Sequence, residues 1–153
     1  MIKKSLMAIA FAALGAIFTV GHAADVEYLH SGKILSPTYP FSEAVRVGDT
    51  VYLAGQVGNI PGTTDIAPGG MKAEATQMME NIKTSLEAHG LSMRNVVKCL
   101  VILTDMSQWG DFNDVYQEYF EEGRYPARSA LGVSALAFGA TVEAECTAVV
   151  GND

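Results

Sequence analysis

The sequence has few of the residues that build metal centres and cofactor sites. Its 153 residues include two cysteines and three histidines, and no Cys-x-x-Cys, His-x-x-His or His-Glu-x-x-His spacing occurs. Outside the first 23 residues, His30 and His89 stand alone. We therefore expect no metal site, because zinc sites need several ligands at short, characteristic spacings. We also expect no cofactor, since the glycine-rich segment GQVGNIPG lacks the spacing of a phosphate-binding loop.

Basic residues are also scarce. Ten lysines and arginines stand against 17 aspartates and glutamates, which gives a net charge of -7. An acidic surface repels phosphate groups, and nucleic-acid affinity depends mainly on Lys and Arg contacts. We therefore expect neither nucleic acid nor an anionic membrane surface as a partner.

The N-terminal segment has the pattern of an export signal. Two lysines precede an uncharged, mostly apolar run over residues 6–20, and Gly21 and Ala23 follow as small residues suited to a signal peptidase. A membrane span needs about 20 apolar residues, so an uncleaved anchor is a less favoured alternative, as is a buried helix. We predict a signal peptide over residues 1–23, one domain over residues 24–153, and a periplasmic or secreted protein. Cleavage would leave 8 basic and 17 acidic residues, a charge of -9.

The two cysteines, Cys99 and Cys146, fall inside the apolar, strand-like segments VVKCLVIL and VEAECTAVV. An oxidising compartment would allow them to form a disulfide. Burial as two small hydrophobic side chains is the simpler explanation, and both alternatives stand.

The rest of the sequence predicts a single domain that combines strands with two helices. After a short extended piece near residues 26–30, strand composition occurs at 44–47, 50–54, 96–104, 128–133 and 142–149. Apolar residues at helical spacing predict helices over 71–86 and 109–120. This order is typical of an α+β domain with both helices on one face of the sheet. We expect Leu53, Leu100 and Ile102 on the opposite face, where apolar side chains favour contact with another subunit.

Arg128 and Glu143 are the residues best suited to chemistry. If the last two predicted strands form an antiparallel hairpin with its turn near residues 135 and 136, these two side chains face each other. A guanidinium binds a carboxylate through two parallel hydrogen bonds, and a nearby glutamate can activate water or deliver a proton. A cross-strand ion pair without chemistry is the alternative.

Six segments, taken in order, resemble the RidA (YjgF) family of imine deaminases. They are PFSEAVRVGDTVYLAGQVG, ENIKTSLEAHG, VVKCLVILTDM, FNDVYQEYF, YPARSALGV and VEAECTAVV. The similarity extends over residues 35–150, and GDTVYLAGQ and PARS are its most specific parts.

The resemblance implies a chorismate-mutase-like α+β fold with a mixed β-sheet, and a homotrimer with sites in the clefts between subunits. It also implies hydrolysis of 2-imino acids, or of their enamine tautomers, to 2-keto acids and ammonia. The expected partner is therefore a small imino acid or carboxylate. By the same resemblance, Arg128 binds the substrate carboxylate and Glu143 positions the attacking water. The further residues implied in substrate binding are Phe41, Gly55, Asn113 and Ala130.

Three positions depart from the usual family pattern. Phe41 stands where tyrosine is usual, Ala54 where serine is common, and Ala130 where cysteine or threonine is common. Each change removes a group that could form hydrogen bonds, which makes the expected pocket less polar. Two alternatives therefore stand beside the deaminase: a protein that binds small carboxylates in the same clefts without turnover, and a chaperone-like protein.

Overall fold

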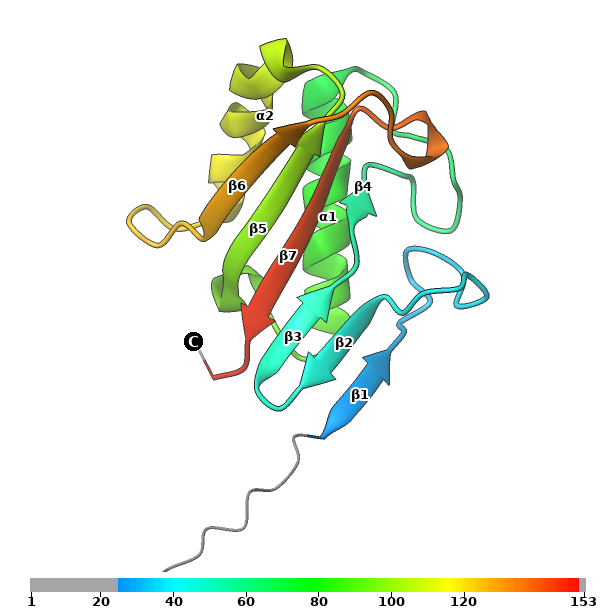
Figure 1. Cartoon of the computed structure of the whole chain (residues 1–153), viewed down its shortest axis with the longest axis vertical. Coiled ribbons are helices and arrows are strands. Elements are labelled where there is room, and N and C mark those ends of the chain that lie inside the picture. Colours follow the sequence, from blue (N-terminus) through cyan, green and yellow to red (C-terminus); the bar gives the residue numbers. More distant parts are fainter. Residues whose placement is uncertain (1–24, 152–153) are drawn as a thin grey trace, which may run out of the picture.

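The fold is a seven-stranded sheet with both helices on one face. In this computed structural model, residues 25–151 are described, and the predicted signal peptide, residues 1–23, lies outside them. The strands are β1 Val26–Leu29, β2 Ala44–Val47, β3 Thr50–Leu53, β4 Gln56–Val57, β5 Val96–Leu103, β6 Ala127–Gly132 and β7 Val142–Val149. Figure 1 shows α1 (Met71–Ala88) and α2 (Trp109–Tyr116) together behind the sheet. The predicted α+β class is confirmed.

The sheet is mixed because one of its pairings is parallel. Its order is β1-β2-β3-β7-β5-β6, with β4 paired to β7. β5 and β6 run parallel, and the other pairs are antiparallel. A parallel pair needs a crossover connection, which α2 supplies between β5 and β6.

Helix α1 packs its predicted apolar stripe on the sheet. Met78, Met79 and Ile82 are fully buried, and burial of such a side chain contributes about 1.5–3 kcal/mol. The helix ends where Gly90 adopts a φ of +76° and the Leu91 amide donates to the Leu86 carbonyl at 2.9 Å. Positive φ suits glycine, which has no Cβ, so Gly90 allows the chain to leave the helix here. Within residues 25–151, no helix is long and apolar enough to cross a membrane.

The predicted hairpin between the last two strands is wrong. β6 and β7 lie on opposite sides of β5, so Arg128 is opposite Cys99 and Glu143 is opposite Ile102. The error came from treating strands that are neighbours in sequence as neighbours in the sheet. Here the α2 crossover places β6 at the edge of the sheet, next to β5, and β7 pairs with the other side of β5.

The expected placement of one open-face residue is also wrong. Leu53 is 3% exposed and belongs to the core beneath the helices, whereas its neighbour Tyr52 is on the other face and 51% exposed. Leu100 and Ile102 are half-buried and lie opposite Glu145 and Glu143, on the face without helices. That face therefore combines exposed apolar side chains with carboxylates.

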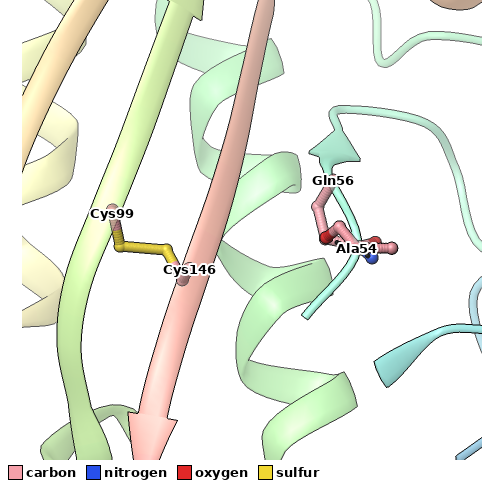
Figure 2. Close-up of a disulfide and its surroundings, with 4 residues drawn as sticks. All are labelled: Ala54, Gln56, Cys99 and Cys146. Atoms are coloured by element: carbon pink, nitrogen blue, oxygen red, sulfur yellow. Dashed lines mark hydrogen bonds between the residues drawn. A yellow bond between two sulfur atoms is a disulfide. The ribbon is translucent and has the colours of Figure 1, made fainter. Parts of the chain in front are cut away.

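Cys99 and Cys146 form a disulfide in the centre of the sheet. They are directly opposite each other in β5 and β7, with a Cα–Cα distance of 4.1 Å (Figure 2). Both are at most 1% exposed and point into the core beneath the helices. The first alternative, a disulfide, is confirmed. The burial that the second alternative expected is also present.

Removal of this disulfide should destabilise the domain markedly. The bridge joins residues 47 positions apart, and closure of a loop of that length contributes about 4 kcal/mol in the chain-entropy model, against typical measured values of roughly 2–4 kcal/mol. We expect Cys99→Ala/Cys146→Ala to lower the free energy of unfolding in urea by that amount. Thiol titration of the unreduced, denatured wild-type protein should detect no thiol, and two reactive thiols would contradict the pairing.

Candidate functional site

One candidate site is a pocket of about 270 Å³ beside β4 and β7, called here the glutamate pocket. Three of the predicted site residues, Phe41, Gly55 and Glu143, line it together. The rest of its lining consists of Leu35, Ala54, Gln56, Val57, Asn59, Ala137 and Phe138. In Figure 1 the turn before β7, drawn in orange, and β4 lie on the same side of the molecule.

The sheet positions Glu143 in this pocket. Glu143 is opposite Val57 in β4, and because strand side chains alternate, it points away from the core that holds Val142 and Ala144. Gly55 is in close contact with it, since a Cβ built at Gly55 would overlap Oε1 and Cδ of Glu143. Only glycine leaves room for the carboxylate here.

A buried carboxylate from α1 fixes the start of β7. Glu74 is 4% exposed and accepts hydrogen bonds from the amide of Thr141 at 2.7 Å and from its hydroxyl at 2.6 Å. The amide of Val142 also donates to Glu74, at 3.2 Å. These bonds hold the backbone immediately before Glu143.

The pKa of Glu143 is raised above its ordinary value of 4.5. Burial is the main cause, because it disfavours the charged form, and the nearby Glu145 carboxylate adds to the effect. A carboxyl group with a raised pKa exchanges protons closer to neutral pH, which suits general acid–base chemistry. Within the part of the chain described, no group of three or more His, Cys, Asp or Glu side chains lies where it could hold a metal.

The other two polar site residues, Asn113 and Arg128, share a second pocket of about 520 Å³, called here the arginine pocket. Its lining is completed by Tyr116, Gln117, Tyr125 and Pro126. Ala130 follows Arg128 by two residues on the same face of β6 but lines neither pocket.

The guanidinium of Arg128 rests on aromatic rings of α2. It lies 4.5 Å from the ring centroid of Tyr116 and 4.7 Å from that of Trp109. Burial raises the pKa of Tyr116 to about 12, although Arg128 acts in the opposite direction. Among residues 25–151, no carboxylate pairs with Arg128. Its charge can therefore bind an anionic ligand.

The two pockets are separate within one chain. β6 and β7 flank β5 and are about 10 Å apart across the sheet. Arg128 lies opposite Cys99, which faces the helices, whereas Glu143 points to the other face. The predicted contact between them is absent, and with it the alternative of an ion pair.

Comparison with known proteins identifies the family. The sequence profile described as endoribonuclease L-PSP matches residues 32–150. The chain belongs to this family. It is the RidA (YjgF) family that the sequence resembles. A 2-iminobutanoate/2-iminopropanoate deaminase of Mus musculus is 45% identical over 112 residues, which are 73% of this chain and 82% of that protein.

Solved structures of RidA relatives share the fold. The crystal structure of RidA from the Antarctic bacterium Psychrobacter sp. PAMC 21119 has a TM-score of 0.75 and 40% identity, and the match covers 81% of this chain and 99% of that chain. The structure of E. coli TdcF with bound serine has a TM-score of 0.73 and 30% identity, with 80% and 98% covered.

Sequence reasoning missed several residues of this candidate site, including two large apolar side chains. Leu35 and Phe138 line the glutamate pocket beside Phe41. It also missed the contact that anchors the loop carrying Phe41: Glu43 accepts hydrogen bonds from the amide and hydroxyl of Ser31 at 2.7 Å and 2.6 Å. Phe138 precedes a glycine in a turn-like segment, and that composition is the only sequence feature that marks its position.

The substitution Gly55→Ala should expel the Glu143 carboxylate from its pocket. Because burial is the main cause of the raised pKa, we expect the pKa of Glu143 to fall toward 4.5 when the side chain moves to solvent. Carbon-detected NMR titration of the carboxyl group measures this shift. Gly110→Ala is the matched control, since a Cβ there meets nothing within 4 Å. An unchanged Glu143 pKa in Gly55→Ala would show that the close contact between Gly55 and Glu143 does not determine where the carboxylate lies.

Proposed function

We propose that this protein hydrolyses 2-imino acids, or their enamine tautomers, to 2-keto acids and ammonia. The observation that carries the proposal is the pair of complementary pockets: Glu143 with a raised pKa in one, and Arg128 without a carboxylate partner in the other. The proposal is supported by the names of the relatives, which include 2-iminobutanoate/2-iminopropanoate deaminases.

In the proposed reaction, Arg128 binds the substrate carboxylate through its planar fork of donors. Glu143 takes a proton from water as the oxygen attacks the imine carbon and delivers that proton to the imine nitrogen, which gives a neutral tetrahedral carbinolamine. Glu143 then takes the proton of the new hydroxyl group and transfers it to the amino nitrogen. The carbon–nitrogen bond breaks, ammonia leaves, and the oxygen becomes the carbonyl of the 2-keto acid.

We further propose that each complete site forms between two copies of the chain in a homotrimer. A small substrate cannot reach both Arg128 and Glu143 of one chain, because they are on opposite faces and separated by β5. A neighbouring copy can supply the missing pocket. The exposed Tyr52 and Leu131 on the face without helices support contact between copies.

The proposed location is the periplasm or the outside of the cell. The N-terminal residues have the pattern of a signal peptide. The buried Cys99–Cys146 disulfide is independent support, because disulfides persist mainly in oxidising compartments.

A binding protein without turnover is the second candidate. Phe41 supports it, since the ring lines the glutamate pocket without a hydroxyl that could orient substrate or water. Such a protein would bind a small carboxylate through Arg128 and would not need the proton chemistry of Glu143.

Substitution of the two charged residues tests the reaction. With imines generated by an amino-acid oxidase and a competing trapping reagent, we expect Glu143→Gln to lower kcat by roughly 100-fold or more. Arg128→Ala should mainly raise KM, because it removes the carboxylate contact. Arg46→Ala in β2 is the charge-matched control and should leave both constants unchanged. If the wild-type protein accelerates no imine loss while Arg128→Ala abolishes stabilisation by small carboxylates, the binding function is correct instead.

The pH profile of kcat/KM should identify Glu143 as the base. Activity should decline as pH falls through its raised pKa, because protonated Glu143 cannot accept a proton from water. Glu145→Gln removes one of the two causes, so the acid limb should move to lower pH while remaining above 4.5, since burial persists. Glu87→Gln, an exposed carboxylate on α1, is the control. An acid limb that is identical in Glu145→Gln and wild type would contradict the assignment.

A further inference from the structure

Two exposed aromatic rings dominate the apolar part of the glutamate pocket. Phe41 is 47% exposed and Phe138 is 42% exposed, although both are large hydrophobic residues. Tyr39 holds them together, with ring centroids 5.8 Å from Phe41 and 6.5 Å from Phe138. Leu35 extends the same wall. The wall thus presents apolar surface next to the carboxylate of Glu143.

Phe138 occupies a backbone conformation that disfavours it. Its φ is 58° and its ψ is 12°, the left-handed region, and Gly139 follows with a φ of 74°. The Ala140 amide donates to the Ala137 carbonyl at 3.0 Å, which closes a tight turn of the kind that Asn-Gly suits best. A bulky residue is rare in this conformation, and such strain concentrates at functional sites.

We propose that the wall formed by Leu35, Phe41 and Phe138 binds the substrate side chain and selects 2-imino acids with aromatic or large aliphatic side chains. This inference rests on the proposed deaminase function and names the substrate class of the same site. The strained turn holds the Phe138 ring against the pocket, a contact that asparagine or glycine would not provide.

The size of the glutamate pocket fits a substrate whose side chain binds here while its carboxylate binds in the arginine pocket of another copy. A volume of about 270 Å³ is just below the range of roughly 300–1,000 Å³ typical of small-molecule sites. The pocket therefore holds the reacting carbon and the side chain, while the carboxylate binds Arg128 of another copy. An alanine-derived imine has only a methyl group and leaves the aromatic wall exposed to water.

The test compares imines made in situ from L-phenylalanine, L-leucine and L-alanine. We expect the wild-type kcat/KM to be higher by at least about tenfold for the first two, since even one methylene in an apolar pocket changes it by roughly 10–200-fold. Phe138→Asn and Phe138→Gly suit the turn and should fold normally, with a melting temperature at or above that of the wild type. Both should lower kcat/KM for the phenylalanine-derived imine by about tenfold or more and hardly change it for the alanine-derived imine. Phe138→Tyr keeps the ring and should keep the preference.

The outcomes separate this inference from the function on which it rests. If the wild-type protein hydrolyses no imine faster than the reaction without protein, or if Glu143→Gln leaves kcat unchanged, the proposed function fails and the inference fails with it. If the alanine-derived imine is hydrolysed as fast as the others, the deaminase stands and the side-chain selection is wrong. The side-chain selection is also wrong if Phe138→Asn lowers kcat/KM equally for all three imines.

Discussion

The pairing of β5 with β7, with Cys99 opposite Cys146, is the constraint on which the rest of the structure depends. Side chains alternate along a strand, so this register sends Ala144 and Cys146 beneath the helices and Glu143 to the open face. A slip by one residue would bury the carboxylate and expose the core side chains. The disulfide prevents such a slip by joining the two strands covalently at the centre of the sheet (Figure 2).

The same central pairing divides the polar site residues between two edges. β7 carries Glu143 on one side of β5, and β6 carries Arg128 on the other. One chain therefore has a cation with no carboxylate beside it and a carboxylate with no cation beside it, within residues 25–151. In the proposed homotrimer, symmetric copies would bring the two pockets together and satisfy both requirements with a single interface.

Local patterns were enough to predict both helices and six of the seven strands, all but the short β4, but not the order of the strands in the sheet. The apolar stripe of α1 and the strand composition of β7 are local properties, and both elements were predicted correctly. The strand that pairs with β6 is set by the crossover through α2. Matching residues of β6 with residues of β7 in the sequence does not show where this crossover places β6. Leu53 points into the core because of the register of β3 against β7, and a register between strands is a tertiary property that local sequence does not contain.

The candidate site was predictable where a residue type determines the chemistry and unpredictable where the backbone does. Glu143 and Arg128 are distinctive in the sequence, whereas the position of Phe138 at the pocket depends on a backbone turn with a left-handed φ of 58°. Burial of Glu143 near Glu145 and the strained turn at Phe138 are both unfavourable, and both occur at the same pocket. The disulfide-linked core offsets these costs, because it stabilises the fold without taking part in the pocket. The disulfide and the candidate site thus lie on opposite faces of β7, where the core side holds Cys146 and the open side holds Glu143.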